Sequence, residues 1–136
     1  MIVEGPYGRF HKDEYADEIW IAGGIGITPF LGLAQDVSDN TDAKIDLYYS
    51  VSNKDEFIHL DELQELAYKN KNFRFFPWIT SENGYLTLNH VAKHSKLLDK
   101  SFYLCGPTGM KEAFKQALHK KNIPVIRIHD ERFAFK

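Results

Sequence analysis

Short apolar runs that alternate with longer amphipathic segments constrain the fold of this chain more than any other feature of its sequence. Strand-like runs cover residues 18–22, 44–51, 72–79 and 101–105, and a last one lies within residues 124–135. Apolar residues at helical spacing fill the intervals, at residues 29–37, 57–68, 86–94 and 107–121. Strands that alternate with helices favour a parallel sheet covered on both faces, so we predict a three-layer α/β/α domain with a five-stranded parallel sheet. Pro77 cannot donate a ladder hydrogen bond, which predicts an edge strand or a bulge at residues 72–79.

Length and charge narrow the class of protein. At 136 residues the chain is long enough for a full core, and we interpret residues 1–136 as a single domain. A net charge of −2 offers no basic face for nucleic acid, and no apolar run approaches the roughly 20 residues of a membrane span. The single cysteine, Cys105, excludes an internal disulfide and fits a reducing compartment. We expect a cytoplasmic domain that contacts neither nucleic acid nor a membrane.

The loop after the first strand is rich in glycine and precedes a helix. Gly23, Gly24 and Gly26 leave the backbone bare, and we predict that Thr28 caps the helix with Pro29 at its first position. Such a helix start offers N–H groups and a positive dipole end to a pyrophosphate. The standard dinucleotide fingerprint is absent, because Pro29 stands where its third glycine belongs, and so is a Walker A lysine. Two readings stay open here, a ligand-binding loop and a tight turn without a ligand.

The loop after the fourth strand repeats this design. Gly106 follows Cys105 at the end of the strand, Pro107 opens the next helix, and Met110 lies in its first turn. Ligands of such sheets bind beyond the carboxyl ends of the strands, and two glycine-lined helix starts at one edge favour a ligand. Cys105 is either a small apolar filler or a residue of that site.

Other polar clusters predict no chemistry. His90 and His94 are spaced for a metal on a helix, but Val91 stands where a zinc protease has its glutamate and no third ligand is evident, so we predict surface histidines and no metal. Carboxylates near the second helix are predicted to form a solvated surface: Asp55, Glu56, Asp61, Glu62 and Glu65. A small hydrolase or phosphotransferase is disfavoured, because the chain has no nucleophile elbow.

Together these features resemble the nucleotide-binding half of the ferredoxin–NADP reductase superfamily. Four segments carry the resemblance in order: Gly5-Pro6-Tyr7-Gly8, Ala22-Gly23-Gly24-Ile25-Gly26-Ile27-Thr28-Pro29, Cys105-Gly106-Pro107-Thr108-Gly109-Met110 and Glu131-Arg132-Phe133-Ala134-Phe135. They are similar to the family's Gly-Pro-x-Gly, Gly-Gly-x-Gly-(Ile/Val)-(Thr/Ala)-Pro, Cys-Gly-Pro-x-x-Met and acid-x-aromatic patterns. The two ends of the chain resemble the ferric-reductase and NADPH-oxidase type members most.

The resemblance implies a module that binds NAD(H) or NADP(H) and positions it for hydride transfer to FAD. Gly5, Pro6 and Gly8 would join it to the flavin-binding β-barrel that precedes this domain in the family. The barrel's Arg-x-(Tyr/Phe)-(Ser/Thr) motif is absent from this sequence, so we expect a flavin domain upstream in a parent protein or on a partner. That parent would be cytoplasmic or lie at the cytoplasmic face of a membrane. The alternative is a stand-alone NAD(P)-binding regulatory module without catalysis.

The same resemblance assigns roles near the reacting rings. Cys105 would flank the nicotinamide at the reacting carbon, with Gly106 and Pro107 shaping its pocket and Met110 anchoring the helix behind. Glu131 would orient this region or relay a proton.

One aromatic residue of the tail would cover the flavin face. Phe133 fits the family's spacing better than Phe135, and the alternative is that both complete the packing of the last strand.

The adenosine end would lie against the loops after the second and third strands. Family members that use NADP often place Ser-Arg after the third strand, where this chain has Thr80-Ser81-Glu82-Asn83. Glu82 would repel a 2′-phosphate and accept from a ribose hydroxyl, which favours NADH. Lys54, a few residues after Ser50, either supplies a positive charge or faces solvent, so the choice between NADH and NADPH stays open.

Overall fold

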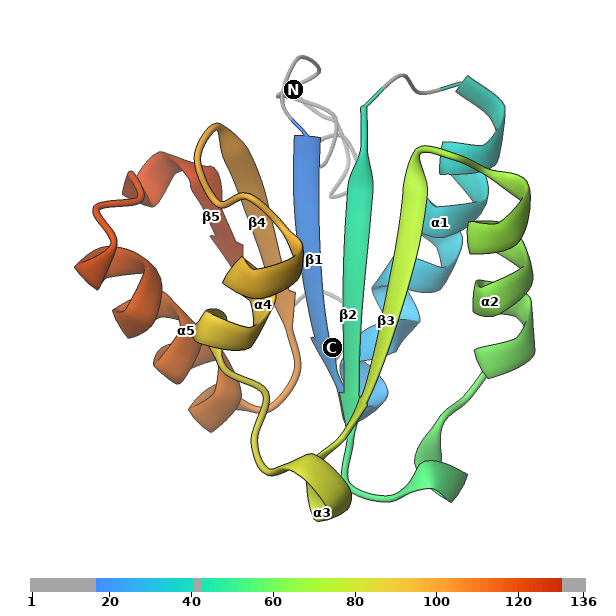
Figure 1. Ribbon diagram of the computed structural model, residues 1–136, viewed down its shortest axis with the longest axis horizontal. Helices are drawn as coiled ribbons and strands as arrows, with labels where there is room; N and C mark the ends of the chain where they lie inside the picture. The colour runs from blue at the N-terminus through green and yellow to red at the C-terminus, as the bar shows by residue number, and fades with distance from the viewer. Residues whose placement is uncertain (1–16, 41–42, 131–136) are drawn as a thin grey trace.

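The sheet has five strands, all parallel. The structure is a computed structural model that describes the backbone of residues 17–40 and 43–130 and all of their side chains except those of residues 35–40. The strands are β1 (Asp17–Gly23), β2 (Ile45–Val51), β3 (Phe73–Ile79), β4 (Lys100–Cys105) and β5 (Ile128–Asp130). Their order is β3-β2-β1-β4-β5, and every neighbouring pair is parallel (Figure 1). The predicted five-stranded parallel sheet is confirmed.

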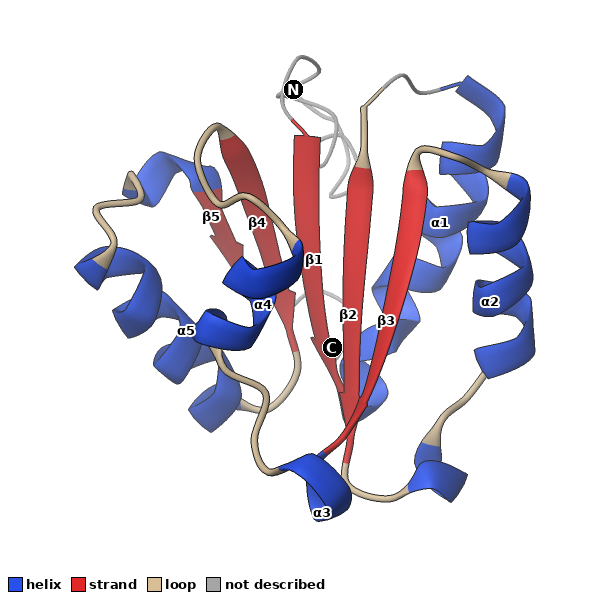
Figure 2. Cartoon of the chain, in the orientation of Figure 1, coloured by secondary structure: helices blue, strands red, loops and turns tan. Residues whose placement is uncertain are grey.

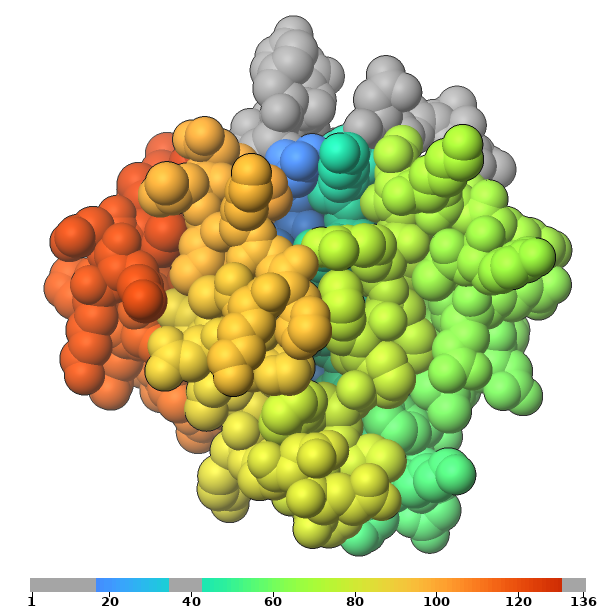
Figure 3. All heavy atoms as spheres, in the orientation of Figure 1, coloured from blue at the N-terminus to red at the C-terminus, as the bar shows by residue number. Residues whose placement is uncertain are grey.

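Helices cover both faces of this sheet. They are α1 (Thr28–Asn40), α2 (Leu60–Lys69), α3 (Thr80–Asn83), α4 (Leu88–His94) and α5 (Thr108–Lys120), with the 3₁₀ turns η2 (Gly24–Ile27), η3 (Lys54–Glu56) and η4 (Val125–Arg127). α1 and α2 lie on one face, and α4 and α5 lie on the other (Figures 1 and 2). In the space-filling view, α4 and the loop after it cover the sheet between α5 and β3 (Figure 3). Within the described ranges, no helix has the length and apolar character that a membrane crossing requires.

The central strand β1 is buried on both faces because its side chains alternate between two cores. Trp20 stacks on Phe30 of α1, with ring centroids 5.1 Å apart. Ile19 and Ile21 join the opposite core together with Phe114 of α5. Burial of a side chain of this size contributes about 1.5–3 kcal/mol. Burial on both faces also explains why the strands appear in the sequence as continuous apolar runs.

Element boundaries differ from the prediction in several places, among them the start of α4, which is Leu88 instead of Leu86. α2 begins at Leu60 instead of Phe57, because η3 forms first and is followed by a short irregular stretch. α3, at the carboxyl end of β3, was not predicted, since residues 80–83 carry no helical apolar spacing. β5 begins at Ile128, because the residues before it form η4. β3 is an edge strand, as Pro77 predicts, and its register with β2 has no bulge.

A buried polar network closes the amino edge of the sheet. Asp46, the second residue of β2, accepts hydrogen bonds from Nε and Nη2 of Arg74 at 2.8 and 2.7 Å and from Oγ of Ser95 at 2.5 Å. Ser95 ends α4, and its hydroxyl also lies 2.7 Å from that of Tyr48. The hydrogen bonds to Asp46 raise the pKa of Arg74 above its ordinary value, which favours its charged form. The network fastens β2, β3 and the end of α4 to one another.

Candidate functional site

The loops after β1 and β4 meet at the carboxyl edge with their backbones in close contact. β1 and β4 are paired up to Ala22 and Cys105. A Cβ atom added to Gly26 would lie 2.2 Å from the carbonyl oxygen of Cys105, and one added to Gly106 would lie 3.0 Å from the backbone N and O of Gly23. Only glycine permits so close an approach. The structure therefore brings together the two loops that the sequence singles out.

Met110 fills the space beside these glycines. A Cβ added to Gly23 would lie 2.6 Å from Sδ of Met110 and 3.1 Å from Cδ of Pro107. One added to Gly106 would lie 2.9 Å from Cε of Met110. Met110 lies in the first turn of α5 and is partly buried, so it links the start of that helix to both loops.

Gly24 differs from the other glycines of these loops. Its φ is +55°, a left-handed conformation that disfavours a side chain, and an added Cβ would meet no atom within 4 Å. It is the first residue of η2, and the next residue, Ile25, is 72% exposed. The backbone at Gly24 is thus open to solvent at the head of a helical segment. That is the arrangement a pyrophosphate needs, because it exposes N–H groups at a positive dipole end.

The predicted cap at Thr28 is wrong. Thr28 has helical backbone angles, φ −53° and ψ −50°, and is the first residue of α1. η2 (Gly24–Ile27) runs directly into α1, so a 3₁₀ turn precedes Thr28 and Pro29 is the second residue of α1. Burial of Ile27, with 0% of its surface exposed, holds η2 against the sheet and explains the early start. The first turn of helical structure after β1 is therefore the glycine turn η2, upstream of Thr28.

Cys105 has its side chain in the core. Its exposed fraction is 0%, and it packs in the cluster on the α1 side of the sheet with Ala22 and Ile27. Its carbonyl oxygen faces Gly26. In this arrangement the side chain lies buried beneath the two loops.

The loops after β2 and β3 are joined by a hydrogen bond. The Ser81 N–H of α3 donates to the carbonyl oxygen of Ser52 at 3.0 Å. Ser50 is buried near the end of β2 and pairs with Gly23, which places it beside the glycine loop. Lys54 in η3 and Glu82 in α3 are exposed, so both charges face solvent at this edge.

Residues from four strand ends thus meet at the carboxyl edge. The structure places there Gly23, Gly24, Gly26, Ser50, Lys54, Ser81, Glu82, Gly106, Pro107 and Met110. Thr28 and Pro29 lie at the start of α1 and Cys105 lies at the end of β4. The remaining predicted site residues lie outside the described ranges: Gly5, Pro6, Gly8, Glu131, Phe133 and Phe135.

A buried ionic cluster at this edge was missed by the sequence analysis. Asp130, the last residue of β5, lies 2.8 Å from Nζ of Lys111 and 2.5 Å from Nζ of Lys115. Burial alone would raise the pKa of Asp130, but the hydrogen bonds from the two lysines hold it below its ordinary value. The cluster ties β5 to the first half of α5. Lysines four residues apart on a helix usually face solvent, so the sequence carries no signal for it.

His90 and His94 pack on aromatic rings. Their ring centroids lie 4.8 Å apart, with His90 4.2 Å from Trp78 and His94 5.5 Å from Phe76. Burial lowers the pKa of His90, and the charges of His94 and Lys93 lower it further. Among the residues that the structure describes, no group of three or more His, Cys, Asp or Glu is placed to hold a metal.

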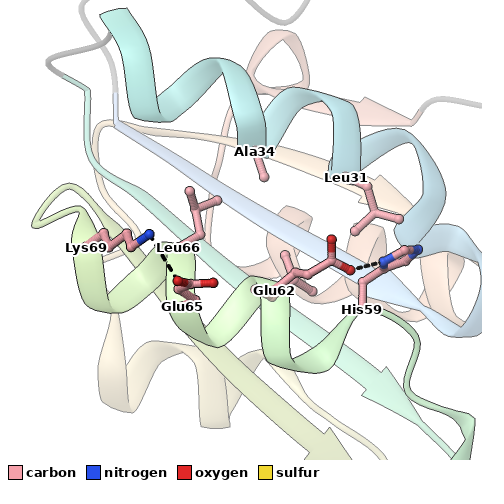
Figure 4. A pocket seen from close by; sticks show the side chains of 8 residues that line it. Leu31, Ala34, His59, Glu62, Glu65, Leu66 and Lys69 are labelled. Atoms are coloured by element: carbon pink, nitrogen blue, oxygen red, sulfur yellow. Dashed lines mark hydrogen bonds and ion pairs between the residues drawn. The ribbon is translucent and has the colours of Figure 1, made fainter.

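A groove of about 340 Å³ lies between α1 and α2, away from the glycine loops (Figure 4). Leu31, Ala34 and Leu66 contribute apolar surface to it. The charges that line it are paired, His59 with Glu62 and Glu65 with Lys69. None of the glycine-loop residues lines this groove, and its ionisable side chains are already paired, so it is a poorer candidate for a charged ligand than the carboxyl edge.

The comparison with known families agrees with this geometry. The model of the oxidoreductase NAD-binding domain family matches residues 20–116, which include the glycine loop and the start of α5. The chain belongs to this family. The predicted family and the predicted NAD-binding function are confirmed.

Named relatives are electron-transfer proteins. The chain is 31% identical to the anthranilate 1,2-dioxygenase electron transfer component of Acinetobacter baylyi, over 98% of this chain and 41% of that protein. It is 31% identical to NADH-cytochrome b5 reductase 1 of Aspergillus terreus, over 85% of this chain and 46% of that protein. The chain thus spans less than half the length of these relatives.

Solved structures show the same fold. A cytochrome P450 reductase of Amycolatopsis has a TM-score of 0.76 and 26% identity, over 98% of this chain and 41% of that chain. A flavohemoglobin of Malassezia yamatoensis has a TM-score of 0.78 and 22% identity, over 88% of this chain and 32% of that chain. At that identity the flavohemoglobin supports the fold alone.

Proposed function

We propose that this chain is the NAD(P)H-binding domain of a flavin-dependent reductase and that it positions the nicotinamide ring for hydride transfer to FAD. The observation that carries the proposal is the open, left-handed backbone of Gly24 at the head of η2 and α1. When bound, the nucleotide supplies a hydride and the flavin accepts it. The chain's own contribution is to hold the nucleotide at the carboxyl edge.

Different loops of that edge bind different parts of the nucleotide. The N–H groups that follow Gly24 bind the pyrophosphate, and the loop at Gly106 and Pro107 receives the nicotinamide. Cys105 acts from beneath, through its backbone, because its side chain is buried. These residues bind and orient the nucleotide, and near-attack geometry is the main lever a protein has in such a transfer.

The tail and the preceding segment complete the site in the parent protein. We assign Glu131 to orienting the nicotinamide region, and Phe133, or Phe135 in a shifted register, to covering the flavin. Gly5, Pro6 and Gly8 connect the domain to a flavin barrel, which we place upstream in a longer chain or on a partner.

The proposal for the final electron acceptor rests on the relatives. Their names favour an oxygenase or a cytochrome as the acceptor. The resemblance of the two chain ends to ferric reductases favours a more specific alternative, a ferric reductase whose full-length protein is bound to a membrane. In either case we propose that the domain works in the cytoplasm or at the cytoplasmic face of a membrane.

NADH is the preferred nucleotide in this proposal. Glu82 is exposed in α3, where a 2′-phosphate of NADPH would meet its negative charge. Lys54, in the loop after β2, is the cation that could offset this charge. Exposed charges at this spacing change affinity by a modest factor, since solvent and salt screen them.

Calorimetric titration with NADH and NADPH at one ionic strength tests the proposal. We expect NADH to bind at least about threefold more tightly than NADPH, and Glu82→Arg to reverse the preference. Glu65→Arg is the matched control, because Glu65 lies on α2 and pairs with Lys69 away from this edge. If the chain, extended by its flavin domain, bound neither nucleotide at millimolar concentration, the proposed function would be wrong.

A further inference from the structure

One carboxylate holds the loop after β2. Oε1 of Glu56 accepts a hydrogen bond from the backbone N–H of Ser52 at 3.2 Å, and Oε2 accepts one from Nδ2 of Asn53 at 3.3 Å. The N–H of Glu56 donates to the carbonyl oxygen of Asn53 at 2.9 Å and closes η3. Glu56 therefore fixes the backbone of Ser52, although its side chain is exposed and the sequence predicts only a solvated acid.

Ser52 in turn holds the neighbouring loop. Its carbonyl oxygen accepts the N–H of Ser81 at 3.0 Å, at the start of α3. The other end of α3 is fixed by Nε1 of Trp78, which donates to the carbonyl oxygen of Gly84 at 2.7 Å. The position of Glu82, between these two contacts, depends on the conformation of Ser52. A chain of hydrogen bonds thus runs from Glu56 through Ser52 to the segment that faces the adenosine end in the proposed function.

The charges around this contact are unbalanced. η3 and the start of α3 carry the carboxylates Asp55, Glu56 and Glu82 against one cation, Lys54. A phosphate monoester near them brings roughly −1.5 to −2 charges at neutral pH. Screening limits the repulsion to groups within about 8–10 Å, so charges of these two loops weigh more than those elsewhere on the surface.

We propose that Glu56 is a positioning and specificity-determining residue of the nucleotide site. Its hydrogen bonds to the loop after β2 place Ser81 and Glu82, and its negative charge disfavours a 2′-phosphate. This inference rests on the proposed function, because it needs a nucleotide at the carboxyl edge. Glu56 acts through two effects, the placement of Ser81 and Glu82 and its own negative charge, and single variants can tell the two apart.

Three variants of the full chain test it by calorimetry with NADH and with NADPH. Glu56→Ala removes both effects and is expected to weaken NADH binding about fivefold. Glu56→Gln keeps an acceptor for Ser52 and removes the charge, so NADH binding stays within about twofold while NADPH binding tightens about threefold. Asp55→Asn is the matched control, since Asp55 carries the same charge in η3 but makes none of the hydrogen bonds that hold Ser52.

Amide hydrogen exchange of the nucleotide-free chain gives a second readout. Exchange at Ser81 is expected to rise about tenfold in Glu56→Ala, because its acceptor Ser52 loses its support, and to stay unchanged in Asp55→Asn. Rescue of the protected amide in Glu56→Gln supports the placement role.

Two results would overturn the inference in distinguishable ways. Equal NADH affinity and equal Ser81 exchange in Glu56→Ala and Asp55→Asn would remove the placement role of Glu56 and leave the proposed function intact. Failure of the unaltered chain to bind either nucleotide, even when it carries its flavin domain, would contradict the proposed function and this inference with it.

Discussion

The sheet is closed differently at its amino edge, where the strands begin, and at its carboxyl edge, where they end. At the amino edge, side chains form the closure, with Asp46 accepting hydrogen bonds from Arg74 and Ser95. At the carboxyl edge, backbone packs on backbone, as Gly26 does on Cys105, and Gly24 is left open. The comparison shows how one sheet serves two needs. Glycine at position 24 leaves the backbone there without a side chain and open to a ligand, whereas the polar network at the amino edge holds α4 in place.

The largest effect is expected from Gly26→Ala. Its new Cβ would lie 2.2 Å from a backbone carbonyl oxygen that cannot move without shifting β4, so we expect a loss of about 3 kcal/mol in the free energy of unfolding. Gly32→Ala is the control, since Gly32 lies within α1 with no atom within 4 Å of an added Cβ, and it should gain about 0.5–1 kcal/mol. Urea titration measures both. Equal stability of the two variants would disprove the backbone closure.

Asp46→Asn tests the opposite edge. It leaves Arg74 without its ionic partner and weakens the contact with Ser95, so we expect a loss of about 2 kcal/mol in the free energy of unfolding. Nucleotide affinity should not change, because this network lies at the other end of the strands. A stable variant with altered NADH affinity would show that the two edges are coupled and not separate.

At the carboxyl edge, β5 is joined to α5 by the ion pairs of Asp130 with Lys111 and Lys115. The pH dependence of stability tests this contribution. The pKa of Asp130 is lowered, so its stabilisation is complete above the ordinary aspartate value and is lost as pH falls through the lower folded value. We expect Asp130→Asn to cost about 1–2 kcal/mol at pH 7, and this difference from the unaltered chain to shrink below about pH 4. Thermal unfolding between pH 7 and pH 3 measures it. A difference that stayed constant over this range would rule out the ionic contribution.

Gly24→Ala is expected to affect stability no more than Asp130→Asn does, but to have the largest effect on binding. The left-handed backbone costs a non-glycine residue about 1–2 kcal/mol, and no clash is added. NADH affinity should nevertheless fall, because the new methyl group stands where the pyrophosphate approaches. Comparison with Gly26→Ala by calorimetry separates the two roles of glycine. Unchanged NADH binding in a folded Gly24→Ala chain would contradict the assignment of this position.

Much of the fold could be predicted from the sequence because local pattern and tertiary burial agree. β1 and β4 lie between two cores and appear as unbroken apolar runs, and Pro77 indicates an edge strand correctly. The start of α1 could not be predicted, because Thr28 and Pro29 have the composition of a helix cap although a 3₁₀ turn already precedes Thr28. That early start depends on burial of the 3₁₀ turn, which the local pattern does not encode.

The location of the site could be predicted from the sequence, but the roles of its individual residues could not. Glycine, helix start and strand end identify the two loops, but the role of each glycine depends on a partner distant in sequence, as Gly26 depends on Cys105. Glu56 has the composition of a surface acid, and only the structure shows its hydrogen bond to Ser52. The sequence around Lys111 likewise does not indicate that this lysine is buried against β5.

The most direct test of the central claim is an amide NMR titration of the chain with NADH. If the glycine turn binds the pyrophosphate, the largest chemical-shift changes will occur at the N–H groups of Gly24, Ile25 and Gly26, with smaller changes at Gly106. The amides around Asp46 at the opposite edge should not move. Saturable binding that leaves the three amides of the turn unshifted would contradict the placement of the nucleotide at this edge.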